Sequence, residues 1–166
     1  MFLKKKPRGT IAIIVAGIIL CASFLISMNT RTDRSLINSN ETLPFTARVI
    51  SPQGVYIQVK VADTDKTREL GLSHTVSLGK KEGMLFIFPQ VGMYSFWMKD
   101  MNFPIDIIWI DENLKIVDRL LSVSPSSYPK TFTPQSPVRY VLELPAGVSN
   151  DYGFIVGSFI SIDQNK

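Results

Sequence analysis

Apolar and polar residues alternate in short stretches along the chain from about residue 45 onwards. The segment Val55–Val61 alternates with a period of two, which is typical of a half-buried β-strand. Phe45–Ile50 is its expected partner strand, because Ser51-Pro-Gln-Gly54 between them has the residues of a tight turn. Further short apolar stretches bounded by Gly, Pro or polar turn residues predict strands at residues 83–89, 105–110, 114–123, 138–144 and 159–162.

One segment carries the signals of a helix. Asp63 or Thr64 can cap its start, and Gly71 can end it. About eight short strands, one helix and frequent Gly and Pro predict a mainly β domain at the margin of the α+β class. We expect a compact antiparallel barrel or sandwich with the helix packed on it. Residues 125–137 contain four prolines and are expected to form an ordered loop without strands.

The N-terminal part of the chain has a different pattern. Residues 11–26 carry no charge, and a helix over residues 10–28 would be about 28 Å long, close to the thickness of a bilayer core. Three lysines and an arginine precede this run, so the positive-inside rule places the rest of the chain outside the cytoplasm. We therefore predict a basic cytoplasmic tail (1–9), a transmembrane signal anchor (10–28), a flexible linker (29–43) and an extracytoplasmic domain (44–166).

Two alternatives to the signal anchor stay open. A cleaved signal peptide would leave the domain secreted. A lipoprotein signal would use Cys21, but Leu20 precedes it where a small residue is needed. Every alternative exports the domain. The anchored form would be a single-pass protein of the cytoplasmic or inner membrane, with its domain in the periplasm of a two-membrane cell.

The distribution of charge argues against a nucleic-acid partner. Residues 1–40 carry six Lys or Arg and one Asp, a net charge of +5. Residues 41–166 carry twelve Lys or Arg and thirteen Asp or Glu, a net charge of −1. A nucleic-acid-binding domain would show a basic patch on its folded part. The single cysteine excludes an internal disulfide, and no phosphate-binding or dinucleotide motif predicts a cofactor.

Several motifs, in their order and spacing, are similar to those of a known family: Val61-Ala-Asp-Thr64, Gly83-Met-Leu-Phe-Ile-Phe-Pro89, Phe96-Trp-Met-Lys99, Pro104-Ile-Asp-Ile-Ile-Trp-Ile-Asp111 and Val141-Leu-Glu-Leu-Pro-Ala-Gly147. Over roughly residues 45–162 the chain resembles domain of unknown function family 192. The resemblance implies a small, compact, β-rich domain that often follows an export signal, and it implies no activity. Asp100 departs from the Asn that is usual after Trp-Met-Lys, and Ser73-His74 departs from the residues that usually follow Gly-Leu.

The segment from Phe96 to Asp106 concentrates side chains that a binding site needs. Trp97 offers an aromatic face, and Lys99 offers a cation for a carboxylate or phosphate. Glu143 lies within an apolar strand, where a carboxylate is rarely buried without a partner. We expect Trp97 and a charged cluster to line a small pocket for an anionic ligand or a peptide end. The candidate charged residues are Asp63, Arg68, Lys99, Asp106 and Glu143.

Three other interpretations remain open for these residues. Arg68–Glu143 or Lys99–Asp106 could be salt bridges that fasten the helix to the sheet, with Asp63 only a helix cap. An Asp106–Glu143 pair could perform acid–base catalysis if the carboxyl groups lie about 5–9 Å apart. A third interpretation is a Cu(I) site made of thioethers, although methionine is also a common core residue. Its ligands would be Met98 and Met101.

His74 is the only histidine, and no nucleophile elbow accompanies it, so we expect an exposed loop residue rather than a catalytic base. The function that the sequence favours is a non-catalytic, membrane-anchored accessory module. It would bind a small anionic ligand, a peptide or an exported partner protein. The alternatives are an enzyme that depends on a carboxylate or lysine, and a Cu(I)-binding protein.

Overall fold

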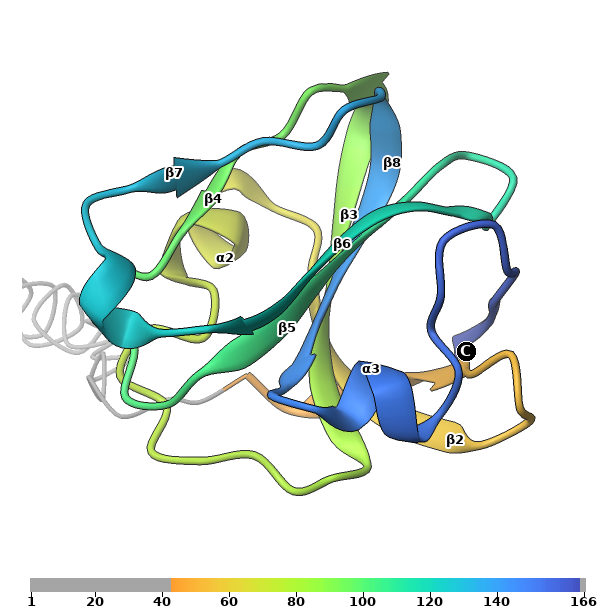
Figure 1. Ribbon diagram of the computed structural model, residues 1–166, viewed down its shortest axis with the longest axis horizontal. Helices are drawn as coiled ribbons and strands as arrows, with labels where there is room; N and C mark the ends of the chain where they lie inside the picture. The colour runs from red at the N-terminus through yellow and green to blue at the C-terminus, as the bar shows by residue number, and fades with distance from the viewer. Residues whose placement is uncertain (1–42, 165–166) are drawn as a thin grey trace, which may run out of the picture. The chain divides into compact units, whose positions relative to one another are not determined.

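The computed structural model of the protein describes residues 43–164 (Figure 1). The strands in that range are β1 (Phe45–Ile50), β2 (Tyr56–Ala62), β3 (Glu82–Gly92), β4 (Phe96–Trp97), β5 (Ile105–Ile110), β6 (Ile116–Val123), β7 (Thr131–Phe132), β8 (Val138–Pro145) and β9 (Ser161–Gln164). The helices are α2 (Asp65–Leu70), α3 (Val148–Asp151) and the 3₁₀ helix η1 (Pro125–Ser127). The predicted tail, the anchor and the linker up to residue 42 lie outside the described residues. No helix within residues 43–164 has the length and apolar character needed to cross a membrane.

Seven of these strands form one open sheet in the order β6-β5-β8-β3-β2-β1-β9. β2 and β3 run parallel, and the other neighbouring pairs of this sheet run antiparallel. β4 and β7 form a separate two-stranded sheet (Figure 1). The mainly β class is confirmed. The predicted antiparallel barrel or sandwich is wrong, because the large sheet is mixed and open.

The connection between β2 and β3 explains the parallel pair. Residues 63–81 separate these strands and include α2, so the chain can return to the starting end of β2 before β3 begins. The two edges of the sheet also approach each other at one end. There the Gly157 N–H donates to the Ile116 carbonyl (2.8 Å), and the Ile160 N–H donates to the Leu114 carbonyl (3.0 Å). The sheet is therefore strongly curled without closing into a continuous ladder.

An apolar core lies on each face of the large sheet. The first core contains Ile108 and Leu142 of the sheet and Phe154 beyond α3. The second core contains Phe86 and Trp109, and the side chains of Phe96 in β4 and Phe132 in β7 pack against it. Successive side chains of a strand point to opposite faces. This alternation decides on which face each polar side chain of β5 and β8 lies.

The predicted helix is present as α2, with narrower bounds than the sequence signals suggested. Thr64 is the capping residue: its hydroxyl accepts the Thr67 N–H at 3.2 Å, and the Thr67 hydroxyl accepts the Thr64 N–H at 3.0 Å. Gly71 ends the helix with a φ of 52°. Four short elements were not predicted, namely α3, the 3₁₀ helix η1 and the two-residue strands β4 and β7. α3 has four residues, and the two-residue strand β7 lies in the proline-rich stretch that was expected to contain no strand.

Candidate functional site

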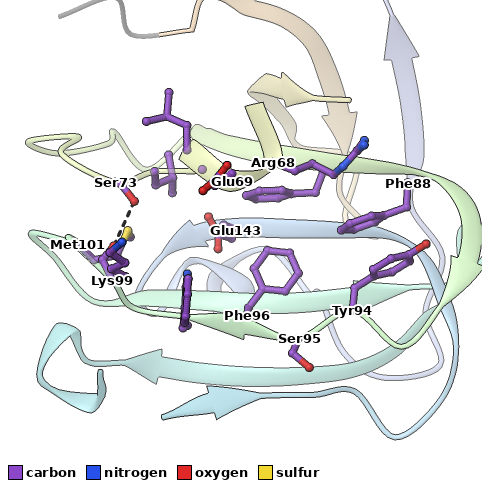
Figure 2. A pocket seen from close by; sticks show the side chains of 15 residues that line it. Arg68, Glu69, Ser73, Phe88, Tyr94, Ser95, Phe96, Lys99, Met101 and Glu143 are labelled. Carbon is purple, nitrogen blue, oxygen red and sulfur yellow. Dashed lines mark hydrogen bonds between the residues drawn. The ribbon is translucent and has the colours of Figure 1, made fainter. Parts of the chain in front are cut away.

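A cavity of about 150 Å³ lies on the second face of the sheet, between β3, β4 and the segment from α2 to Ser73 (Figure 2). Fifteen residues line it. Five are aromatic: Phe86, Phe88, Tyr94, Phe96 and Trp97. Four are charged: Arg68, Glu69, Lys99 and Glu143. Four of the six predicted site residues, namely Arg68, Trp97, Lys99 and Glu143, therefore share one cavity.

Glu143 reaches this cavity from the central strand β8. Leu142 and Leu144 belong to the first core and Val141 to the second, so the alternation of the strand turns Glu143 towards the second face. The residue is only 4% exposed. Burial raises the pKa of the Glu143 carboxyl from 4.5 to about 8, because the charged form loses its hydration. At neutral pH the group is therefore mainly a protonated carboxylic acid.

The predicted pairing of Glu143 is wrong. Its Oε2 is buried, and none of residues 43–164 forms a hydrogen bond with it. The salt bridges in the same part of the chain join other residues. A buried polar atom without a partner is rare in folded proteins. This carboxyl group therefore has hydrogen-bonding capacity that a bound molecule could use.

Arg68 does not supply the missing partner, although it lines the same cavity. Its Nη1 donates to the carbonyl oxygens of Asp63 (2.6 Å) and Ile87 (2.8 Å), and its Nη2 pairs with Asp65 Oδ1 (2.6 Å). The guanidinium carbon lies 5.5 Å from the centre of the Phe88 ring. Figure 2 shows the guanidinium group directed towards Phe88 and away from the carboxyl group of β8. Arg68 fastens α2 to β3, and the predicted Arg68–Glu143 salt bridge is wrong.

Lys99 and Trp97 form the exposed rim of the cavity. Trp97 is 51% exposed, and its ring meets the Tyr128 ring edge-on at 6.0 Å. The Lys99 Nζ lies 5.9 Å from the centre of the Trp97 ring. The Ser73 hydroxyl donates to the Lys99 carbonyl at 3.1 Å, which joins the end of α2 to the segment after β4 (Figure 2). The Lys99 ammonium makes no salt bridge within residues 43–164, so the predicted Lys99–Asp106 pair is also wrong.

Asp106 lies on the opposite face of the sheet from Glu143. Its fully buried carboxylate accepts the N–H groups of Ser122 (2.8 Å), Gly147 (3.0 Å) and Ser149 (3.0 Å), and also the Ser149 hydroxyl (2.7 Å). It therefore holds β6 and the start of α3 against β5. The sheet separates the two carboxyl groups, so an Asp106–Glu143 acid–base pair in one site is excluded by this geometry.

Of the remaining candidates, only Met101 lines the cavity. Asp63 is exposed and lines a separate hollow beside β1. Met98 is 1% exposed and packs in the second core, whereas Met101 lines the cavity. The thioether of Met98 is therefore accounted for by core packing. His74 is exposed with a φ of 62°, and its N–H donates to the Asp100 carbonyl at 2.9 Å.

Apart from Trp97, the aromatic wall of the cavity was not predicted. The Phe88 and Tyr94 rings stack at 3.5 Å, and the Phe86 and Phe96 rings meet edge-on at 4.9 Å. The Tyr94 hydroxyl donates to the Gln90 carbonyl at 2.8 Å, which holds the Tyr94 ring in place. The alternation of β3 puts Phe86 and Phe88 on one face, and this signal was present in the sequence. Glu69 had no such signal, because only the position of α2 over the sheet brings it to the cavity.

A family model matches residues 48–162 of the chain, and its description is DUF192, Uncharacterized ACR, COG1430. The chain belongs to this family. The match covers more than half of the sequence, so the resemblance that the motifs indicated is confirmed. No curated protein matches the chain.

Two solved structures resemble this DUF192 domain. A protein of unknown function from Novosphingobium aromaticivorans DSM 12444 is 24% identical, with a TM-score of 0.64 over 70% of this chain and 83% of that chain. A protein from Sinorhizobium meliloti 1021, described as a "putative transcription regulator", is 28% identical, with a TM-score of 0.61 over 71% of this chain and 91% of that chain. The first likeness supports the fold alone.

Proposed function

We propose that this DUF192 domain is a non-catalytic binding module that holds a small ligand, or one end of a peptide or partner protein, in the cavity beside α2. The observation that carries this proposal is the buried Glu143 carboxyl group, whose Oε2 has no partner within residues 43–164. Leaving a buried polar group without a hydrogen bond costs on the order of 1–3 kcal/mol. A ligand that completes the hydrogen bonding of Glu143 would remove this cost.

The walls of the cavity support binding because ring contacts and hydrogen bonds already hold them. Phe96 packs edge-on against Phe86, Phe88 and Trp109, and Arg68 ties α2 to β3. A site that is ordered before binding loses less conformational entropy when its ligand arrives. Contacts within the domain therefore already hold the walls of the cavity before any ligand binds.

The hydroxyl groups at the cavity support binding over nucleophilic catalysis. Ser73 donates to the Lys99 carbonyl, and Ser95 pairs with Thr133 at 2.7 Å. A serine nucleophile needs an adjacent base, and neither of these contacts provides one. The fifteen lining residues include no histidine or cysteine.

The proposal places this module outside the cytoplasm on a membrane anchor. Its support is the uncharged apolar run at residues 11–26 behind a basic tail. The residues that line the cavity lie between positions 68 and 143, after this apolar run. An anchored domain would therefore meet its ligand or exported partner in the extracytoplasmic space. The sequence by itself suggests a small anionic ligand, a peptide or an exported partner protein. The proposal keeps only that the cavity holds a small ligand or one end of a larger molecule.

An enzyme is the second candidate, and one observation favours it. The pKa of Glu143, raised to about 8 by burial, lies near neutrality, where a carboxyl group can both donate and accept a proton. General acid–base catalysis with this single carboxyl would require the substrate to supply the other reacting group. An enzyme would convert a bound molecule, whereas a binding module would release it unchanged.

A role in transcription, suggested by the description of the Sinorhizobium meliloti protein, has less support in this chain. Residues 41–166 have a net charge of −1. DNA binding depends on neutralising phosphates with Lys and Arg side chains. We therefore propose a ligand or protein partner and no nucleic acid.

Native mass spectrometry of the full-length chain in a nonionic detergent tests the proposal. We expect the purified protein to carry a bound small molecule that Glu143→Gln loses. Glu112→Gln makes the same change at an exposed turn and should retain it. If the molecule is lost during purification, a library of small fragments should still shift the NMR signal of the Trp97 indole N–H.

The binding proposal is contradicted if no mass copurifies and no fragment shifts that signal. Incubating the bound molecule with fresh protein separates the two candidates. An altered mass that appears with the wild-type chain and not with Glu143→Gln would favour the enzyme.

A further inference from the structure

The charges around the cavity indicate which chemical class the ligand belongs to. The charged groups that line it besides Glu143 are Arg68 and Glu69 of α2 and Lys99 beyond β4. The Arg68 guanidinium is already engaged by Asp65 and by two backbone carbonyls. Glu69 makes no salt bridge within residues 43–164. Two carboxyl groups, one on the sheet and one on the helix, therefore line this space, and neither forms a salt bridge with Arg68 or Lys99.

The walls next to Glu143 favour a cation as well. The faces of aromatic rings attract positive charge, and five aromatic residues line the cavity. A buried carboxylate is costly unless an opposite charge or several hydrogen bonds accompany it. An anion in the same place would lie next to the oxygens of Glu143. The interior of the cavity is therefore more favourable for a positive group than for a negative one.

Lys99 does not place its own ammonium group next to Glu143. The Lys99 side chain is exposed at the rim, and its Nζ lies 5.9 Å from the centre of the Trp97 ring. Figure 2 shows Lys99 beside Met101 and Ser73, at one end of the cavity, with Glu143 between it and Arg68. The cavity thus contains a buried acid and aromatic walls, and neither Arg68 nor Lys99 forms a salt bridge with that acid.

We propose that the cavity binds a small organic cation, an aliphatic ammonium group, whose positive charge replaces the proton of Glu143. This inference rests on the proposed function as a binding module and names its ligand class. A cavity of about 150 Å³ is the size that accepts a benzene molecule, so the bound group has about five or six non-hydrogen atoms. It could be a free amine or the amino end of a longer molecule that extends past Trp97.

The proton balance of this binding step makes the inference testable. The Glu143 carboxylic acid releases one proton to the solvent, and the resulting carboxylate pairs with the ammonium group. No covalent bond changes apart from the O–H bond of the carboxylic acid, whose proton passes to water. Since burial holds the pKa of Glu143 at about 8, affinity should rise with pH up to about 8 and level off above it. An aliphatic ammonium group keeps its charge over this range, because its pKa is about 10.

The experiment compares three molecules of similar size that differ in charge: butylammonium, 1-butanol and butyrate. Each is titrated into the full-length chain in a nonionic detergent, and the Trp97 indole N–H signal is followed by NMR at pH 6.5 and pH 8.5. We expect butylammonium to bind about tenfold more tightly than butanol, with butyrate weakest. Butylammonium affinity should increase roughly 25-fold between the two pH values, because the ionised fraction of a carboxyl with a pKa of about 8 rises by that factor.

Glu143→Gln should abolish both the preference for butylammonium and its pH dependence, and Glu112→Gln should keep both. The pH comparison in the wild-type chain tests the inference even if Glu143→Gln folds poorly. Equal binding of butanol and butylammonium would overturn the cation inference, and so would tighter binding of butyrate at the lower pH. Either result would leave the binding module intact, whereas failure of all three molecules and of every other fragment would contradict both proposals.

Discussion

At the scale of single residues, Glu143 makes the stability of the domain depend on pH. Its pKa is 4.5 in the unfolded chain and about 8 in the folded protein because of burial, so the folded state keeps a proton that the unfolded state loses between these values. The contribution is therefore fully present below about pH 4.5 and is lost as pH rises to about 8. At about 1.4 kcal/mol per pKa unit, the full effect is on the order of 4–5 kcal/mol.

We expect Glu143→Gln to remove this part of the pH dependence, because the amide does not titrate. Urea denaturation at pH 5, 7 and 9 would measure the free energy of unfolding of each variant. Wild type should lose stability relative to Glu143→Gln as the pH rises, and Glu112→Gln should behave as wild type does. Parallel curves for wild type and Glu143→Gln would show that the carboxyl group is not held in its protonated form.

Asp106 has a structural role at the same scale, and its removal should be strongly destabilising. Asp106→Ala would leave three N–H groups and one hydroxyl without their acceptor. We expect a loss of about 3 kcal/mol or more in the free energy of unfolding, measured in urea. Asp111→Ala removes a carboxylate that accepts two N–H groups at a turn, and it should cost about 1 kcal/mol. Similar losses for both variants would contradict the central role assigned to Asp106.

At the scale of elements, the contact between β3 and β8 depends on a residue without a side chain. A Cβ atom at Gly83 would lie 2.7 Å from the Glu143 carbonyl oxygen and 2.8 Å from a methyl group of Leu144. Any larger residue would push β3 away from β8 and disturb the strand that carries Glu143. The absence of a side chain at Gly83 thus lets β3 pack closely against β8, the strand that carries Glu143 to the cavity.

We expect Gly83→Ala to destabilise the domain by about 2 kcal/mol, since overpacking a buried contact typically costs 1–3 kcal/mol. Gly79→Ala is the matched control, because the nearest atoms at Gly79 belong to the flexible Glu82 side chain at 3.4 Å. Thermal denaturation of both variants would measure the difference. Comparable melting temperatures would mean that β3 and β8 can separate without loss.

The elements differ in how well they could be predicted. The alternation of β2 and the cap at Thr64 are local signals, so the strand and the start of α2 were found within a few residues. β4 and β7 have two residues each, and a run of that length has no detectable periodicity. They exist because their side chains pack on the second core, which depends on residues far away in the chain.

At the scale of the whole molecule, the sequence predicts a domain held outside the cytoplasm. A C-terminal alkaline phosphatase fusion to the full-length chain should be active, because this enzyme needs disulfides that form only outside the cytoplasm. The fusion should also sediment with membranes. A fusion in which residues 4–8 carry acidic residues in place of the lysines and arginine should lose activity. An inactive wild-type fusion in the soluble fraction would contradict export.

The sequence by itself determined what depends on neighbouring residues and on motif order. The mainly β class, the capped helix and membership of DUF192 all follow from alternation, turn residues and local spacing. The motifs also pointed to Trp97, Lys99 and Glu143 as candidates. These three residues line one cavity, although the pairing expected for Glu143 was wrong.

Only the tertiary structure decided which of the charged residues face each other. In the paired strands β5 and β8, Asp106 and Glu143 are one residue out of register, so Asp106 points towards α3 and Glu143 towards the cavity. This register becomes visible only when the strands pair. Arg68 could have paired with Glu143, but Asp65 and the Ile87 carbonyl lie within its reach instead. Such contacts join segments that are remote in sequence, and the packing of the whole chain sets the distances between those segments.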